Sequence, residues 1–395
     1  MAKGDPLLIA GGGIAGLSLG LALARRGKAS RILERNTVFS EAGAGIQIGP
    51  NGMGVLRRLG LAGSLAPLAA WPTAIEVRDG GSGQRLTRLP LGDWIAQRHG
   101  APYGVIHRAD LQSILLDAAR MEPLIEIVTG FRVGAISEGA SGVTVDSETG
   151  DRQRGSALVG ADGLWSAVRP WVDPGADLNF SGKTASRTVV PIEAVLSDYR
   201  TVTTIWLMSQ AHIVAYPVRG GQALACVVVV EGSWPGRGWG QAVEAETVLG
   251  KLAGADRRLL DLLRQAQEWR SWALYDPEAL SAWSKGPVVL IGDAAHPVLP
   301  FLAQGGVMAL EDAETLAVCL TRYGDDVTTA FASYEAQRRP RITRVQRASR
   351  RNGGIYHASG PTALARDSVL RLTPGGVLMR QYDWLYGWPG PTVPA

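Results

Sequence analysis

The sequence predicts a mixed α/β protein, and three observations support this prediction. Residues 7–34 read as an apolar strand, a glycine-rich turn, a helix and a second strand. Two later segments, 157–169 and 288–320, each place a short apolar strand before a turn and a helix. Residues 186–232 hold strand-like runs such as TTIWLM, HIVAYPV and ALACVVVVEG. Repeated strand–turn–helix units indicate a parallel sheet covered by helices, whereas consecutive strands indicate a mostly antiparallel sheet.

The composition is that of an ordinary globular protein. The chain has 395 residues, enough for two or three domains, with 46% hydrophobic and 19% charged residues. The net charge is +4, but no basic and aromatic module accompanies it, which argues against nucleic-acid binding. Cys226 and Cys319 lie in apolar runs, so we expect buried thiols in a reducing compartment. We expect no metal site.

The run LLIAGGGIAGLSLGLALARRG, residues 7–27, is compatible with an export signal, a membrane span or a nucleotide-binding turn. The spacing Gly11-x-Gly13-x-x-Gly16, with Glu34 ending the next strand, favours the nucleotide-binding turn. Gly11 would allow the turn, Gly13 would let a pyrophosphate approach, and Gly16 would let helix and strand pack closely. Glu34 would accept hydrogen bonds from a ribose. This segment alone leaves NAD and FAD open, and we expect a cytoplasmic protein without membrane contact.

Two downstream motifs decide between these cofactors. ALVGADGLWSAVR contains Asp162-Gly163, and VVLIGDAAHPVLPFLAQGGVMALEDAETLAVCL contains Gly292-Asp293. Either pair alone is an ordinary turn. Together, and in this order after the glycine turn, they resemble the signature of the flavoprotein aromatic hydroxylases, the single-component FAD monooxygenases. The resemblance runs from Leu7 to about Trp388.

The resemblance implies an FAD site. The residues implied to hold FAD are Gly11, Gly13, Ala15, Gly16 and Glu34 for the ADP half, Arg35 and Arg108 along the flavin cleft, and Asp162, Asp293, Gly305 and Gly306 around the remainder. Asp293 would bond the ribityl chain, and Asp162 would also meet the transient co-substrate NADH. The helix opening at Gly305 would aim its amides at the flavin ring, where negative charge develops on reduction. Residues 303–307 read AQGGV and depart from the common GQGMN pattern, which puts a side-chain contact from Val307 in doubt.

These anchors also divide the chain into three parts. A Rossmann-like FAD-binding domain would comprise residues 1–72, 101–175 and 286–350. An inserted, mostly antiparallel substrate domain would comprise residues 73–100 and 176–285 and would roof the substrate over the flavin. Residues 351–395 would form a C-terminal helical tail.

The chemistry that the resemblance implies is ring hydroxylation. NADH reduces FAD, O₂ adds to the reduced flavin, and the hydroperoxide delivers one oxygen atom to a phenolic ring. Removing the phenolic proton activates such a ring, so we expect a base. His212 and Tyr216 share one face of a predicted strand and are the candidate catalytic pair. The alternative is a core histidine beside a packing tyrosine, although HIVAYPVRGG resembles the substrate strand of 3-hydroxybenzoate 6-hydroxylases and 6-hydroxynicotinate 3-monooxygenases.

The substrate is less defined. Gln47 lies where relatives place a polar residue near the substrate, and Phe301 would form an apolar wall where relatives tend to carry Gln or His. The tail segments IYHASG and YDWLYGW most resemble 3-hydroxybenzoate 6-hydroxylases. A salicylate or 6-hydroxynicotinate hydroxylase, a non-oxygenating FAD dehydrogenase or reductase, and a catalytically silent FAD-binding protein stay open. So do NADPH in place of NADH and assembly as a homodimer.

Overall fold

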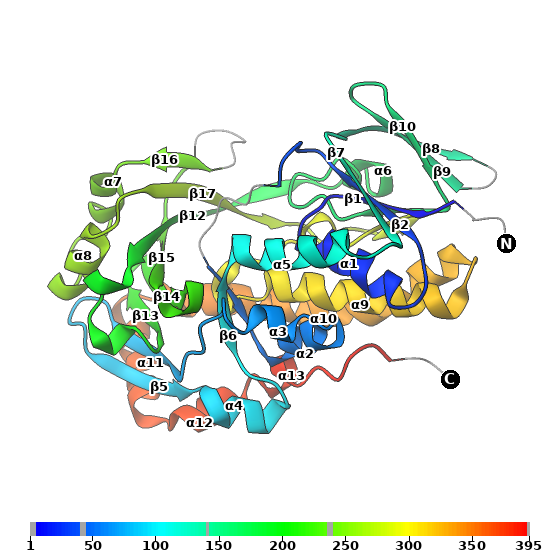
Figure 1. Ribbon diagram of the computed structural model, residues 1–395. Coiled ribbons are helices and arrows are strands. Elements are labelled where there is room, and N and C mark those ends of the chain that lie inside the picture. The colour runs from blue at the N-terminus through cyan, green and yellow to red at the C-terminus, as the bar shows by residue number, and fades with distance from the viewer. Residues whose placement is uncertain (1–4, 40–44, 140–141, 235–239, 393–395) are drawn as a thin grey trace.

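The computed structural model describes residues 5–39, 45–139, 142–234 and 240–392, whose elements gather around two large sheets (Figure 1). The first sheet has six strands, in the spatial order β18 (Ser284–Lys285), β19 (Val288–Leu290), β11 (Leu158–Gly160), β1 (Leu7–Ala10), β2 (Ser30–Glu34) and β7 (Ile125–Thr129). All neighbouring strands run parallel except β18 and β19. Both faces of β1 are buried, which explains its continuous apolar sequence.

Long helices cover this sheet: α1 (Ile14–Ala24), α5 (Arg108–Arg120), α9 (Gly305–Tyr323) and α10 (Val327–Tyr356). Helix α1 contacts both α5 and α9, and α10 lies along α9 (Figure 1). All eleven residues of α1 are buried. The apolar run 7–27 is therefore a core strand and a core helix, as the strand–turn–helix interpretation predicts. No helix in the described part of the chain is long and apolar enough to cross a membrane.

The second sheet has eight strands and lies on the left in Figure 1. Its spatial order is β16 (Gln241–Val243), β17 (Trp269–Pro277), β12 (Leu178–Pro191), β15 (Ala223–Glu231), β14 (Ala211–Val218), β13 (Thr203–Met208), β4 (Ala74–Asp79) and β5 (Arg85–Pro90). Only β13 and β4 are parallel. The predicted combination of a parallel sheet and a mostly antiparallel sheet is confirmed.

Strand β14 has two different faces because its side chains alternate. Ile213 and Ala215 point into a core shared with α7 (Ala245–Leu249) and α8 (Arg257–Arg264). Val214 and Tyr216 belong instead to the large core that includes the first sheet. The face carrying His212 and Tyr216 is thus the one turned toward the nucleotide-type layer.

The described residues also form two smaller sheets: β3 (Gly45–Ile48) with β6 (Gly104–His107), and β8 (Val133–Gly139), β9 (Gly142–Ser147) and β10 (Arg152–Gly155). The remaining α-helices are α2 (Pro50–Arg58), α3 (Ala62–Leu65), α4 (Gly92–His99), α6 (Arg169–Val172), α11 (Gly360–Leu372), α12 (Gly375–Arg380) and α13 (Asp383–Tyr386). Strand β3 contacts α9, and β6 contacts β14, so this small sheet lies between the two large ones. Cys226 and Cys319 are buried free thiols, as predicted.

The two large sheets use segments of the chain similar to those of the two predicted domains, but the boundaries differ in two places. Strand β18 joins the six-stranded sheet, whereas the predicted substrate domain extends to residue 285. Helix α10 continues without a break past residue 350, where the helical tail was expected to begin. The division into domains stays a prediction.

Candidate active site

The three glycines of the Gly11-x-Gly13-x-x-Gly16 motif face different surroundings. Gly11 has a φ of +106°, and a Cβ atom there would lie 2.5 Å from the carbonyl oxygen of Ala161. A Cβ atom at Gly16 would overlap the carbonyl oxygen of Gly11. At Gly13, the residue directly before α1, no atom of the described residues lies within 4 Å of that position, apart from Gly13 and its two chain neighbours. Gly11 and Gly16 are therefore required by the fold, whereas Gly13 leaves room for a ligand.

Glu34 closes one side of this turn. Its Oε2 accepts a hydrogen bond of 2.8 Å from the Gly12 N–H, and its Oε1 accepts one of 2.9 Å from the Asn36 N–H. The residue is 8% exposed. A carboxylate held in this way keeps further lone pairs for the hydroxyl groups of a ribose.

A cavity of about 630 Å³ opens at the carboxyl ends of β1 and β2. Seven of the predicted cofactor residues line it: Gly11, Gly13, Glu34, Arg35, Arg108, Asp162 and Asp293. Ala15, Gly16, Gly305 and Gly306 do not line this cavity. In open α/β sheets, ligands bind at the carboxyl ends of the strands.

Two acidic residues reach this cavity from different loops. Asp162 follows β11, and its Oδ2 accepts hydrogen bonds from the N–H groups of Ala167 (2.7 Å) and Val168 (3.3 Å). Its Oδ1 is buried and has no hydrogen-bond partner among the described residues. Burial raises the pKa of Asp162. Asp293 lies in the 3₁₀ turn Gly292–Ala294, and its side chain is exposed.

Arg169 ties these two loops together. Its guanidinium donates hydrogen bonds to the carbonyl oxygens of Leu164 (2.8 Å), Asp293 (2.7 Å) and Ala294 (2.7 Å). The side chain is 6% exposed. One buried arginine thus fixes the spacing between the Asp162 turn and the Asp293 turn, a role that the sequence did not reveal.

The first backbone N–H groups of α9 have no side-chain cap, and they lie close to the Asp293 turn. Its N-cap, Gln304, makes no capping hydrogen bond, and no acidic residue lies in its first turn. The Asp293 Oδ1 lies 4.0 Å from the position of a Cβ atom at Gly305, and a Cβ atom at Gly306 would overlap the side chain of Ile46 in β3. The helix dipole and these amides favour negative charge beside Gly305.

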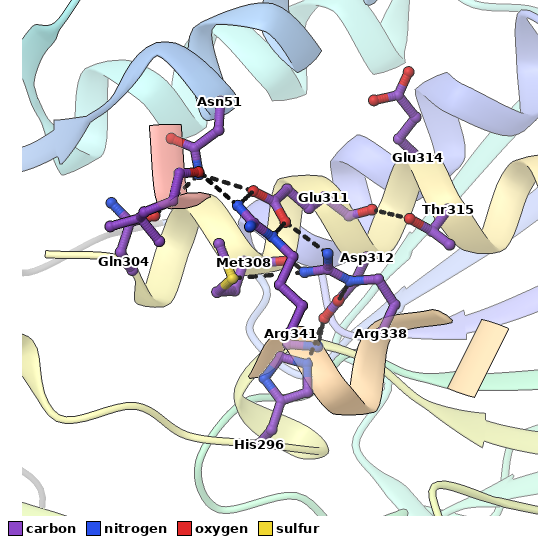
Figure 2. Close-up of polar contacts among 12 residues, drawn as sticks. Asn51, His296, Gln304, Met308, Glu311, Asp312, Glu314, Thr315, Arg338 and Arg341 are labelled. Carbon is purple, nitrogen blue, oxygen red and sulfur yellow. Dashed lines mark hydrogen bonds and ion pairs between the residues drawn. The ribbon is translucent and has the colours of Figure 1, made fainter. Parts of the chain in front are cut away.

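A buried ionic network anchors this part of α9 (Figure 2). Asp312 accepts hydrogen bonds from the Gly292 N–H (2.9 Å), from His296 Nε2 (2.6 Å) and from Arg338 Nε (2.7 Å). Burial opposes ionisation of Asp312, but His296 and Arg338 outweigh it and lower its pKa to about 2. Figure 2 shows the carboxylate between the imidazole and the guanidinium. The network holds the Asp293 turn against α9 and α10.

Glu311 forms the second centre of this network. Its carboxylate accepts hydrogen bonds from Arg338 Nη1 (2.6 Å) and from Nε and Nη2 of Arg341. It also accepts one from Asn51 Nδ2 (2.8 Å). Asn51 Nδ2 also lies 3.1 Å from Gln304 Oε1, at the start of α9. All these contacts are buried or partly buried, so they fix the position of the helix N-terminus (Figure 2).

His212 and Tyr216 share a face of β14, as predicted, but contact different segments. His212 is 2% exposed, and its Nδ1 lies 2.8 Å from Nε2 of His357. The Tyr216 hydroxyl donates a hydrogen bond of 2.8 Å to the carbonyl oxygen of Gly45 in β3. Burial, together with His357 and Lys183, lowers the pKa of His212 well below 6.5, and burial raises the pKa of Tyr216 to about 12. Neither residue lines the 630 Å³ cavity.

The two predicted substrate residues lie near this strand. Phe301 is 5% exposed, and its ring centroid lies 5.5 Å from that of His212. It occupies the 3₁₀ turn Pro300–Leu302, directly before α9. Gln47 lies in β3 and accepts a hydrogen bond from the hydroxyl of the buried Tyr103. Phe301 is thus an apolar neighbour of the candidate base, whereas Gln47 already has a polar partner.

The polar groups around the cavity and at the start of α9 fit FAD. The open space at Gly13 and the uncapped start of α1 suit a pyrophosphate. Asp162 lines a ligand-sized cavity, and its buried Oδ1 has no hydrogen-bond partner among the described residues. The uncapped start of α9 at Gly305 suits the electron-rich edge of a reduced ring.

Several lining residues were missed by the sequence analysis. Asn36, Phe39, Gln112, Phe131, Arg132, Val133 and Trp165 also line the cavity. The glycine motif predicts the turn that they surround, but these residues form no recognisable sequence motif themselves. His357 could have been singled out, because it lies in the IYHASG segment that already supported the resemblance.

The chain is similar to proteins of known families over most of its length. A family model described as FAD binding domain matches residues 5–349. A 3-hydroxybenzoate 6-hydroxylase of Polaromonas naphthalenivorans (strain CJ2) is 36% identical over 391 residues, 97% of this chain and 96% of that protein. A 6-hydroxynicotinate 3-monooxygenase of Bordetella bronchiseptica (strain ATCC BAA-588 / NCTC 13252 / RB50) is 33% identical, covering 91% of this chain and 94% of that protein.

The fold is also similar to solved structures. The crystal structure of Klebsiella pneumoniae HpxO complexed with FAD and uric acid has a TM-score of 0.85 and 26% sequence identity, and the match covers 97% of each chain. The family model and the relatives both span most of the chain. The chain therefore belongs to the flavoprotein aromatic hydroxylases, the single-component FAD-dependent monooxygenases.

Proposed function

We propose that this enzyme hydroxylates a phenolic benzoate, with 3-hydroxybenzoate as the first candidate, and consumes NADH and O₂. The observation that carries this proposal is the near-complete alignment with a 3-hydroxybenzoate 6-hydroxylase at 36% identity. The product would be the 2,5-dihydroxybenzoate. The more distant 6-hydroxynicotinate 3-monooxygenase makes a hydroxylated pyridine carboxylate the second candidate.

Bound FAD would supply the redox and oxygen-activating chemistry. Gly11, Gly13 and Glu34 would hold its ADP half, and the amides at Gly305 would favour its reduced, anionic form. Asp162 and Asp293 would bond the polar atoms between these two ends. The buried Arg169 and the Asp312 network would keep both loops in place while the cofactor is bound.

His212 would act as the base that takes the phenolic proton. An imidazole with a pKa well below 6.5 is neutral at pH 7 and can accept a proton. Removing that proton makes the ring electron-rich, which hydroxylation requires. Phe301 lies against His212 and would exclude water from the ring. Tyr216 has a pKa near 12, so it would position the substrate as a neutral hydrogen-bonding group.

One screen tests this function against its alternatives. Purified FAD-loaded enzyme is mixed with NADH or NADPH and with 3-hydroxybenzoate, salicylate or 6-hydroxynicotinate. Oxygen uptake and the aromatic product are followed together. We expect 3-hydroxybenzoate to stimulate NADH-dependent oxygen uptake and to yield the dihydroxybenzoate. Stimulated NADH oxidation without a hydroxylated product would favour a reductase, and no stimulation by any of the three would reject the proposal.

A further inference from the structure

A chain of hydrogen bonds leads from His212 to the protein surface. His212 Nδ1 lies 2.8 Å from His357 Nε2, and His357 Nδ1 lies 3.3 Å from Glu231 Oε1. The two imidazole rings are buried, whereas the Glu231 side chain is 40% exposed. The three residues come from β14, from the C-terminal end of α10 and from the last position of β15. Only the folded chain brings them together.

The exposed carboxylate sets the direction of these hydrogen bonds. Ionised Glu231 can only accept, so His357 must carry its proton on Nδ1. In a neutral ring, His357 Nε2 is then an acceptor, and His212 must donate to it from Nδ1. The Nε2 of His212 is left with its lone pair and makes no hydrogen bond to the described residues. These hydrogen bonds thus leave His212 Nε2 as the proton acceptor of the ring.

We propose that His212, His357 and Glu231 form a relay that carries the phenolic proton of the substrate to solvent. The relay rests on the proposed function, which supplies the proton. The phenol O–H bond breaks as a bond to His212 Nε2 forms. The Nδ1 proton of His212 passes to His357 Nε2, and the Nδ1 proton of His357 passes through Glu231 to water. One proton reaches solvent, the electron pair stays on the phenolate oxygen, and both rings end in the opposite tautomer.

The surroundings of His212 explain why such a route is needed. Its ring centroid lies 5.5 Å from that of Phe301 and 5.2 Å from that of Tyr356. Phe301 belongs to an apolar cluster with Val229 and Leu299. Among the described residues, His357 is therefore the hydrogen-bond partner through which a proton can leave His212.

Other charged and titratable groups flank the relay. Lys183 in β12 lies 3.5 Å from Glu231 and stabilises its carboxylate. Arg366 in α11 donates to the carbonyl oxygens of Ile355 and Tyr356, directly before His357, and is paired with Asp367. Burial lowers the pKa of His357, and Lys183 adds to this effect while Glu231 opposes it. Both histidines are therefore neutral at pH 7, the state in which the relay conducts.

The first test needs no turnover. The FAD-loaded enzyme is labelled with ¹⁵N-histidine, and long-range ¹H–¹⁵N correlation spectra at pH 7.5 report which ring nitrogen carries each proton. The variants His212→Gln and His357→Gln assign the two signals. We expect both residues to be protonated on Nδ1. A His212 protonated on Nε2 would overturn the proposal, because its base would already be occupied.

The second test follows hydroxylation of 3-hydroxybenzoate against pH. Glu231→Gln and His357→Gln should slow it about 10-fold at pH 7 and leave FAD content unchanged, and the rate should recover about 10-fold per pH unit as hydroxide replaces the relay. The control is His99→Gln, a buried histidine in α4 that contacts Asp383 and should keep the wild-type profile. A wild-type profile in Glu231→Gln would contradict the relay. If the wild-type enzyme hydroxylates no phenol, the proposed function fails, while the tautomer spectra still decide the relay's direction.

Discussion

Gly13 directly precedes α1 and Gly16 lies in its first turn, yet the two glycines meet opposite surroundings, which separates ligand binding from folding at the level of single residues. Within the part of the chain that the structure describes, only the chain neighbours of Gly13 come within 4 Å of a Cβ atom there, whereas a Cβ atom at Gly16 would overlap the Gly11 carbonyl oxygen. The first position is open for a cofactor, and the second is closed by the fold. A methyl group at each position should therefore fail in a different way.

We expect Gly13→Ala to keep the stability of the apoprotein within about 1 kcal/mol, since only the N-cap preference of α1 changes. Its affinity for FAD should fall at least about 10-fold, because the methyl group takes the space of the ligand. Gly16→Ala should lose several kcal/mol through backbone displacement. Thermal unfolding and FAD titration of both variants measure these effects. Equal FAD affinity in Gly13→Ala and wild type would contradict the assignment.

The proposed base His212 lies apart from the proposed FAD cavity, so a substitution there should separate catalysis from cofactor binding. We expect His212→Gln to lower hydroxylation by about 100-fold or more, the usual contribution of a general base. FAD content should not change, because His212 does not line the FAD cavity. The ratio of product to NADH consumed shows whether the loss lies in ring activation. An unchanged turnover number would remove His212 from the mechanism.

Asp312 links the buried network to pH. Its pKa is about 2 in the folded protein, below its ordinary value of 3.8. A depressed carboxyl pKa stabilises the fold above the unfolded-state value, and this contribution is lost as pH falls from about 4 through 2. The substitution Asp312→Asn removes the negative charge beside the buried Arg338. It should lower the free energy of unfolding by about 3–5 kcal/mol at pH 7.

Urea unfolding at pH 7 and along a pH series measures this cost. The control is Glu126→Gln, which removes an exposed partner of Arg31 and should change stability by less than about 1 kcal/mol. Equal losses in the two variants would show that the buried network does not hold the loops.

At the scale of elements, the site depends on how the Asp162 loop, the Asp293 turn and α9 are held together. Arg169 bonds the first two, and Asp312 bonds the Asp293 turn to α9 and α10. These connections come from side chains outside the cavity. Because these hydrogen bonds need no cofactor, we expect them to order the loops before FAD binds, which would lower the entropy that binding must overcome.

Arg169→Lys tests the connection between the loops. One ammonium group cannot reach three carbonyl oxygens in fixed directions, so at least one buried acceptor loses its partner. We expect a loss of about 2–3 kcal/mol in stability and weaker FAD binding. Arg152→Lys, at an exposed pair with Asp146, serves as the control and should be nearly neutral. Thermal unfolding and FAD titration are the measurements, and an unchanged FAD affinity in Arg169→Lys would refute this role.

Local elements could be predicted because their signals are local. The strand, turn and helix at Leu7–Ala24 follow from apolar runs on either side of the Gly11-x-Gly13-x-x-Gly16 spacing, and TTIWLM coincides with β13. The bond between His212 and His357 spans 145 positions, and that between Arg169 and Asp293 spans 124. No periodicity reports such pairs. The sequence therefore predicted the strand–turn–helix unit at Leu7–Ala24 and the strand that carries His212, but not the side chains that contact His212 and the Asp293 turn.

For the whole molecule, the cavity draws on β1, β2, α5 and the loops after β7, β11 and β19, so bound FAD should stabilise the entire fold. A ligand that binds only the folded state at 100 times its Kd adds about 2.7 kcal/mol. We expect removal of FAD to lower the Tm by several degrees and its re-addition to restore it. Scanning calorimetry measures this, with Gly13→Ala expected to respond less than wild type. An unchanged Tm would contradict the cavity assignment.

The most direct measurement for the whole account is turnover of 3-hydroxybenzoate with NADH under ¹⁸O₂. The account predicts one ¹⁸O atom in each dihydroxybenzoate molecule and one NADH consumed per product. Oxygen drawn from water, or NADH oxidation that forms only hydrogen peroxide with every phenolic acid tested, would contradict the assignment of this chain as an aromatic hydroxylase.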